Sequence, residues 1–295
     1  MNRVIIAIAT ALAPTGAQAQ STGEAVLEPG SAWDASYAEG RCRLSRLFGA
    51  PGQQHALVFE QRAPGSSFNM TVAGPATSAI NGGLNLQLAF GPGGPASDQV
   101  IVTERNPEFG SVLFLKDIDL KPAAATEAGA GANVGLSAPR DAIDVEAAGP
   151  LRSIMLSQGG QRLVFNTGPL AAPFGVLNDC TAHILTTWGI DPEAHRTAQR
   201  KARMREEMAV ARAIQQQYPL RTAREGRGGV VGLAILVDQS GKPTECKITN
   251  DSGDGNLNAV ACEGLMQARF DPALDAKGQP INSYWMTRVT YRIAN

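Results

Sequence analysis

The sequence lacks an excess of charge of either sign. Its formal net charge is -1 over 295 residues, and no long run of like charges occurs. Binding to nucleic acid or to an anionic membrane surface depends on clustered Lys and Arg side chains that neutralise phosphates. We therefore expect neither nucleic acid nor a membrane surface among the partners.

A hydrophobic run long enough to cross a bilayer is also missing, since that takes roughly 20 apolar residues. A stretch of about ten, Val4–Ala13, lies between Arg3 and the small-x-small pattern Ala17-Gln18-Ala19, an arrangement typical of a signal peptide. We expect cleavage after Ala19, removal of residues 1–19 and export to the periplasm. No cysteine stands at the cleavage point, so lipid attachment has no acceptor there and stable membrane insertion after processing is not expected.

Catalytic and metal-binding patterns are missing as well. The three histidines, His55, His183 and His195, have no spacing that places two on one metal, and no Gly-x-Ser-x-Gly motif accompanies them. Asn166-Thr167-Gly168 resembles the Asp-Thr-Gly loop of aspartic proteases, but an amide stands where a carboxylate base is required. We expect no enzyme, no cofactor and no metal.

Two further stretches, one acidic and one rich in glycine, resemble ligand-binding loops in sequence. Asn250–Ala261 begins with the spacing of a calcium loop, yet Ala261 occupies the position that needs a bidentate carboxylate. Gly226, Gly228 and Gly229 precede an expected strand, whereas a phosphate-binding loop follows a strand and opens a helix. We interpret the first as a turn followed by a helix start, and no nucleotide site follows from the second.

Four cysteines are present: Cys42, Cys180, Cys246 and Cys262. In an oxidising compartment cysteines are more often paired than metal-bound or catalytic, although four free buried thiols are the alternative. Four cysteines allow three pairings. We favour Cys42 with Cys180 and Cys246 with Cys262, because the last two lie within one compact segment while the first two bracket the rest.

The chain divides into segments of different pattern. After a loose segment over residues 20–31, short apolar runs alternate with Gly, Pro and Asn clusters over residues 32–188, which predicts a β-rich domain of unknown family. Residues 123–132 lack large apolar side chains and are expected to form a loop. A helix behind Pro173 would carry Cys180, and a bond to Cys42 would join the last element of this domain to its first.

Residues 189–217 are expected to form a linker helix. Asp191-Pro192 is a strong helix start, with Asp as N-cap and Pro in the first turn, and no Gly or Pro follows for two dozen residues. This helix must end before Tyr218-Pro219.

The last segment, residues 218–295, predicts two strands, a helix and a final strand. Val230–Val237 and a strand through Cys246 flank a turn at Asp238–Gly241, and Leu257 begins a run of small and apolar residues at helical spacing. The final strand covers residues 284–293. The fold class is therefore α+β, with a β-β-α-β unit that contains a three-stranded sheet. A disulfide between the second strand and the helix would stabilise this unit.

Several fragments of this segment occur in a characteristic order: Tyr218-Pro219, Asp238–Gly241, Asp251-Ser252-Gly253, Leu257 and Arg269–Ala273. In order and spacing they resemble the C-terminal domain of TonB proteins over about residues 215–295. The resemblance implies a periplasmic domain whose sheet edge binds the TonB box, an extended segment of outer-membrane receptors, as an added strand. This is β-augmentation, in which main-chain hydrogen bonds provide the affinity.

Within this resemblance the last strand is the expected partner-binding edge. The residues expected to bind the partner are Ser283, Tyr284, Trp285, Met286, Thr287, Arg288, Val289 and Tyr291. Alternate residues lie on opposite faces, and the sequence leaves open which face is buried. Core packing is the alternative role for Trp285 and Tyr291.

Three hypotheses for function follow. A TonB energy transducer has an N-terminal membrane helix and a Pro-rich spacer, and we expect neither here. The first hypothesis is therefore a soluble periplasmic adaptor, with a link to TonB-dependent outer-membrane transport. The second makes the β-rich domain an enzyme or ligand-binding module docked by the TonB-like domain, which a deep pocket in residues 32–188 would favour. The third is a membrane-anchored transducer that retains residues 1–19.

Overall fold

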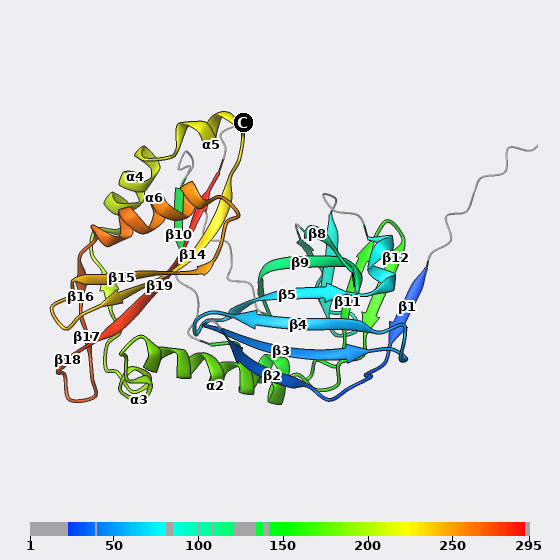
Figure 1. Ribbon diagram of the computed structural model, residues 1–295. Helices are drawn as coiled ribbons and strands as arrows, with labels where there is room; N and C mark the ends of the chain where they lie inside the picture. The colour runs from blue at the N-terminus through cyan, green and yellow to red at the C-terminus, as the bar shows by residue number, and fades with distance from the viewer. Residues whose placement is uncertain are drawn as a thin grey trace, which may run out of the picture.

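The computed structural model describes residues 23–38, 40–80, 85–99, 101–107, 109–120 and 142–292, and the backbone of residues 134–137. The expected signal peptide and the expected loop over residues 123–132 lie outside these residues. Figure 1 shows a β-rich part, a smaller part with helices against a sheet, and the helix α2 running from one toward the other. The fold class is α+β, as predicted.

Two sheets build the β-rich part. The six-stranded sheet has the order β2-β3-β4-β5-β9-β8 and the five-stranded sheet the order β1-β12-β11-β6-β7. The first contains β2 (Asp34–Ala38), β3 (Arg41–Phe48), β4 (His55–Gln61), β5 (Ser67–Ala73), β9 (Gly110–Asp119) and β8 (Ile101–Asn106). The second contains β1 (Glu24–Leu27), β12 (Gln161–Phe165), β11 (Ile154–Gln158), β6 (Leu86–Phe90) and β7 (Ser97–Gln99). The short helices η1 (Pro75–Ala79) and α1 (Val145–Ala148) lie between strands.

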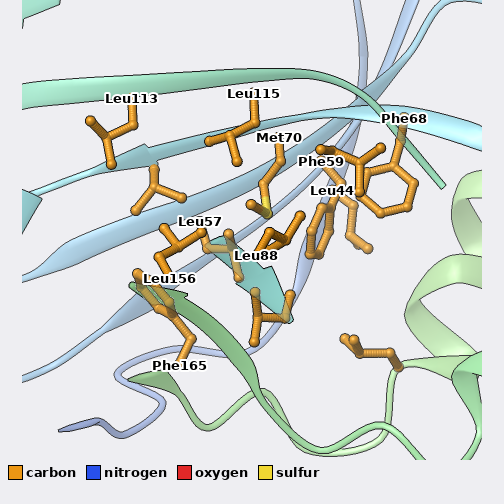
Figure 2. Packing of buried hydrophobic residues seen from close by; sticks show 14 of the residues in the cluster. Leu44, Leu57, Phe59, Phe68, Met70, Leu88, Leu113, Leu115, Leu156 and Phe165 are labelled. Carbon is orange, nitrogen blue, oxygen red and sulfur yellow. The ribbon is translucent and has the colours of Figure 1, made fainter. Parts of the chain in front are cut away.

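The two sheets bury one hydrophobic core between them. In β4 every second residue, from His55 to Gln61, is buried, which is the two-residue period of a strand with one face inward. Figure 2 shows Leu57 and Phe59 of the six-stranded sheet opposite Leu156 and Phe165 of the other. The segment whose sequence pattern predicts a β-rich domain therefore folds into two sheets packed face to face.

Helix α2 (Ala171–Thr187) closes the end of this core. Its Phe174 ring lies 5.0 Å from the ring of Phe59 and 5.1 Å from that of Phe68. One turn and a half later, Cys180 is disulfide-bonded to Cys42 of β3. The helix is thus held to the sheet by both packing and a covalent bond, in the pairing that the sequence favours.

The prediction of a loose segment over residues 20–31 is wrong for β1. Glu24–Leu27 pair in parallel with β12, from Glu24 opposite Arg162 to Leu27 opposite Phe165. Ala25 and Leu27 also pack against the hydrophobic core. Without β1, β12 would be the edge strand of this sheet and would have unpaired backbone groups. The local sequence of residues 20–31 does not reveal this pairing.

The prediction of one linker helix over residues 189–217 is wrong as well. The structure has α3 (Pro192–Arg196), the two-residue strand β13 (Arg203–Met204) and α4 (Glu207–Gln216). Asp191 caps α3 as predicted, accepting hydrogen bonds from the backbone N–H groups of Glu193 and Ala194. Between the helices the backbone instead pairs with residues of the C-terminal part, and these tertiary hydrogen bonds override helix propensity.

The C-terminal part contains the predicted β-β-α-β unit. Strands β14 (Gly229–Val237), β15 (Pro243–Asn250) and β19 (Ser283–Tyr291) form the three-stranded sheet, and α6 (Gly255–Met266) covers one face. A fourth strand, β10 (Val134–Ser137), joins this sheet, whose order is β10-β19-β14-β15. The smaller elements are α5 (Leu220–Arg224), β16 (Phe270–Asp271), β17 (Ala273–Leu274) and β18 (Pro280–Ile281).

Both faces of this sheet are covered. On one face, Val231, Leu233 and Ile235 of β14 form a hydrophobic cluster with residues of α4 and α6. On the other face, Leu236 of β14 packs with Leu185 at the end of α2. The sheet therefore lies between its own helices and the helix that closes the β-rich part.

Candidate partner-binding site

The predicted binding strand, β19, lies in the interior of the four-stranded sheet. It pairs antiparallel with β14 along its whole length, from Ser283 opposite Val237 to Tyr291 opposite Gly229. At its C-terminal end it also pairs with β10 on the other side. The sheet edge expected from the sequence is thus partly occupied.

The side chains of β19 are mostly buried, on both faces. Val289 and Tyr291 are 0% and 3% exposed and belong to the cluster beneath α4 and α6. The hydroxyl of Tyr291 donates to the carbonyl oxygen of Leu257 at 3.2 Å, and burial raises the pKa of Tyr291 far above its ordinary value. Trp285 packs against the same cluster, with its ring 5.5 Å from that of Phe270.

On the opposite face, Tyr284 contacts the end of the β-rich part. Its ring stacks on His195 at 4.4 Å and meets Trp188 edge-on at 6.1 Å. Core packing is therefore the role of Tyr284, Trp285 and Tyr291. What β19 can offer a partner is its backbone edge rather than a row of side chains.

A bulge in β9 connects this strand to the β-rich part. Lys116 and Asp117 together stand opposite the single residue Asn69 of β5, where the register shifts. Asp117 has a φ of 60°, and its backbone N–H donates to Oδ1 of Asn69 at 3.0 Å. Oδ1 of Asp117 forms an ion pair with Nη2 of Arg288 at 3.0 Å, while Nζ of Lys116 donates to the carbonyl oxygen of Asp251 at 2.9 Å. Both residues of the bulge therefore reach the C-terminal part.

The occupant of the β19 edge is β10, which comes from between β9 and α1. It runs antiparallel to β19, with Val134 opposite Tyr291 and Ser137 opposite Arg288. Among the described residues, no strand pairs with Ser283–Thr287 on that side. The edge of β19 therefore already accepts an extended segment from outside the β-β-α-β unit.

The other edge of the sheet, β15, carries features that discourage strand addition. It begins with Pro243, which has no N–H to donate, and the charged Glu245 and Lys247 form an ion pair along it. Proline and charges on an edge strand oppose pairing with another chain. Between these two edges, β19 is the better template for a partner strand.

The turn and helix start after β15 are held by two carboxylates. Oδ1 of Asp251 accepts from the backbone N–H of Gly253 and from Nδ2 of Asn258, both at 2.7 Å. Asp254 caps α6 through the backbone N–H of Asn256 at 2.9 Å and forms an ion pair with Arg227. Burial raises the pKa of Asp254, but these hydrogen bonds and the positive charge of Arg227 outweigh it and hold the pKa below its ordinary value. This stretch, which imitates a calcium loop in sequence, uses its carboxylates to fix its own backbone.

The second disulfide joins this helix to the sheet. Cys246 of β15 is bonded to Cys262 of α6, the second pair that the sequence favours. Both residues lie at the margin of the cluster beneath the sheet. The smaller part of the molecule is thus stabilised by its own staple.

Residues 214–293 match the family of Gram-negative bacterial TonB protein C-terminal domains. The match covers this segment and no more of the chain. No curated protein and no solved structure gave a significant match.

Domains of the TonB C-terminal family act in protein interaction and energy transduction and are not enzymes. Their partners are envelope and outer-membrane proteins. The segment carrying the match begins within α4 and includes the whole three-stranded sheet with α6. We call residues 214–293 the TonB_C domain from here on.

Within the described ranges, no group of three or more His, Cys, Asp or Glu side chains is arranged to hold a metal ion. Nε2 of the buried His55 accepts from the backbone N–H of Ala76 at 2.9 Å, so this histidine has a structural role. None of the helices in the described part of the chain is both long and apolar enough to cross a membrane.

A groove of about 670 Å³ crosses the outer face of the six-stranded sheet and ends at Asp251 of the TonB_C domain. Its charged wall is a cluster in which Glu60 faces three arginines. Oε2 of Glu60 lies 2.8 Å from Nε of Arg43 and 3.8 Å from Nη1 of Arg41. Oε1 of Glu60 lies 3.5 Å from Nε of Arg62. The groove contains neither a histidine nor a cysteine among its lining residues. Sequence reasoning missed this feature, because its residues come from strands that periodicity alone does not assemble.

Proposed function

We propose that this protein is an exported periplasmic adaptor whose TonB_C domain binds an extended segment of an envelope or outer-membrane protein by β-augmentation at β19. The observation that carries the proposal is that β19 pairs with β10, a segment from another part of the chain. A strand edge that accepts one extended segment has the backbone geometry to accept another. The β-rich part is then available to a second partner, so the protein would connect two envelope components.

Burial supports the backbone edge as the binding element. Ser283, Thr287 and Val289 are at most 1% exposed, so a partner cannot read these side chains without unfolding the sheet. The N–H and C=O groups on the outer side of β19 are the groups that a new strand uses. Selectivity would come from side chains flanking the added strand.

A photo-crosslinking residue introduced at single positions in the producing cell tests this proposal. Benzoylphenylalanine in place of Thr290 on β19 should give adducts with an envelope protein, joined through one extended segment of that protein. The same residue in place of Lys247 on β15 is the matched control and should give few adducts. Equal adducts at both positions, or adducts from the β-rich part alone, would contradict capture at β19.

Export is the second component of the proposal. Two disulfides are typical of proteins that fold outside the cytoplasm. The proposed boundary after Ala19 is tested by sequencing the N-terminus of the protein purified from its host, where Gln20 is expected. An intact Met1 in the membrane fraction would instead support the membrane-anchored energy transducer.

The groove favours a second candidate function, the binding of a small anionic ligand by the β-rich part. At one end of the groove, three arginines form ion pairs with the same glutamate, Glu60. Val58 and Phe114 form an apolar part of its wall. A fatty acid such as decanoate has both complementary features. Saturable binding of decanoate that Phe114→Asp abolishes would favour this candidate, and the absence of saturable binding would remove it.

A further inference from the structure

β10 occupies the same edge that the proposed function assigns to a partner. It lies outside the TonB_C domain, in the chain between β9 and α1. Among the strands that the structure describes, it forms the end of the four-stranded sheet, with β19 as its one neighbour there. A partner segment bound at Arg288–Tyr291 and β10 therefore cannot be present together.

The register of β10 shows which of its residues stand opposite which residues of β19. Val134 stands opposite Tyr291, and Leu136 stands opposite Val289. These two residues of β19 are buried in the core beneath α4 and α6. The residues between and after them in β10 are Gly135 and Ser137, both small. Apolar residues thus alternate with small residues along the segment whose backbone pairs with this edge.

β10 is also a short occupant of a long edge. It has four residues, whereas β19 has nine. Pro139, two residues beyond β10 in the sequence, has no N–H to donate, whereas a valine at that position would have one. A partner segment without proline could pair along Ser283–Thr287 as well, and the additional backbone hydrogen bonds would favour it over β10.

We propose that β10 is an internal, displaceable occupant of the partner-binding edge. The partner is an extended segment that runs antiparallel to β19, carries apolar residues at alternate positions and continues past the end of β10. This inference rests on the proposed function and adds its regulation. Capture is then an exchange of strands, and the apparent affinity is lowered by the fraction of molecules in which β10 is paired.

Two peptides in trans test the exchange in the full-length protein. The first is a fluorescein-labelled peptide of residues 132–141, and the second is the same peptide with Pro139→Val. A variant in which β10 should no longer pair with β19 carries Gly135→Pro with Leu136→Pro, and we call it the freed protein. Because successive N–H groups of a strand point to opposite sides, two consecutive prolines remove a donor facing β19 whichever way β10 is oriented. A second freed protein lacks residues 134–137 and covers the case in which the proline variant does not fold.

The matched control carries Ala124→Pro with Ala125→Pro, two prolines outside β10. We expect both freed proteins to bind the peptides at least tenfold more tightly than the wild type and the control, as measured by fluorescence anisotropy. We also expect the Pro139→Val peptide to bind more tightly than the native one. Equal affinity for the two peptides would overturn pairing along Ser283–Thr287.

The remaining outcomes separate the inference from the proposed function. Equal, measurable binding by the wild type, the control and the freed proteins would overturn self-occupancy while leaving capture at β19 intact. No binding of either peptide by a folded freed protein would overturn both, because an empty edge that rejects its own segment does not accept strands in trans.

Discussion

Asp117 in the bulge of β9 and Arg288 on β19 form an ion pair, with Oδ1 and Nη2 3.0 Å apart and both side chains about a quarter exposed or less. The pair joins the β-rich part to the strand that we propose as the binding edge. Arg288 also stands opposite Ser137, the last residue of β10. The contact between the two parts and the occupied edge therefore meet at one residue.

Breaking this pair should cost a modest amount of stability. We expect a double-mutant cycle of Arg288→Met and Asp117→Asn, measured by urea unfolding, to give a coupling free energy of about 0.5–1 kcal/mol that falls at high salt. The control pair is Glu193 and Arg196 on α3, whose side chains are 67% and 71% exposed. Its coupling should be close to zero, and an equal coupling for the two pairs would contradict a specific role for Arg288.

The two disulfides should differ in their contribution to stability. Cys42 and Cys180 are separated by 138 residues, and Cys246 and Cys262 by 16. In the loop-entropy account, replacing the first pair by alanine costs about 4–5 kcal/mol and replacing the second costs about 3 kcal/mol. Urea unfolding of the two double variants measures the difference. A larger loss for the 246–262 pair would show that strain or residual structure outweighs loop length.

Gly264 of α6 should not tolerate a methyl group. A Cβ added there would overlap the fully buried side chain of Ile214 on α4. Alanine favours a helix over glycine by up to about 1 kcal/mol, so a destabilised Gly264→Ala variant reports the overlap. We expect a loss of about 1–3 kcal/mol. Gly255→Ala is the matched control, because the same helix leaves open space around that position, and thermal unfolding should show it unchanged or slightly more stable.

His55 should make stability depend on pH. Burial lowers the pKa of His55, and its Nε2 accepts a hydrogen bond that the protonated ring cannot accept. The unfolded chain, with an ordinary pKa of about 6.5, therefore binds a proton more readily than the folded one. This contribution is present above about pH 6.5 and is lost as the pH falls through the lower folded-state pKa. His55→Gln should flatten the pH dependence of the unfolding free energy between about pH 5 and 7, and an unchanged slope would contradict this role.

Much of the fold follows from local patterns in the sequence. The alternation in residues 55–61 identifies β4, and the Asp-Pro pair at 191–192 marks the start of α3. The ordered fragments of the C-terminal segment identify the TonB_C domain, which the family match confirms. Each of these signals depends on neighbours a few residues away.

The features that sequence reasoning missed depend on distant partners. The region between α3 and α4 has the composition of a helix, yet Arg203 and Met204 pair with Asp271 and Phe270. β10 is four residues in a stretch rich in Ala and Gly, and what makes it a strand is the edge of β19, about 150 residues further along the chain. No local period encodes such a pairing, because the energy that fixes it comes from backbone groups elsewhere in the fold.

The central claim, that the outer edge of β19 binds extended segments, is tested most directly by amide hydrogen exchange resolved by NMR. The protein lacking residues 134–137 is compared with and without the Pro139→Val peptide. The account predicts that the peptide slows exchange at β19 amides that do not donate to β14, with little change along β15. Unchanged exchange along β19, or protection along β15 instead, would contradict the claim.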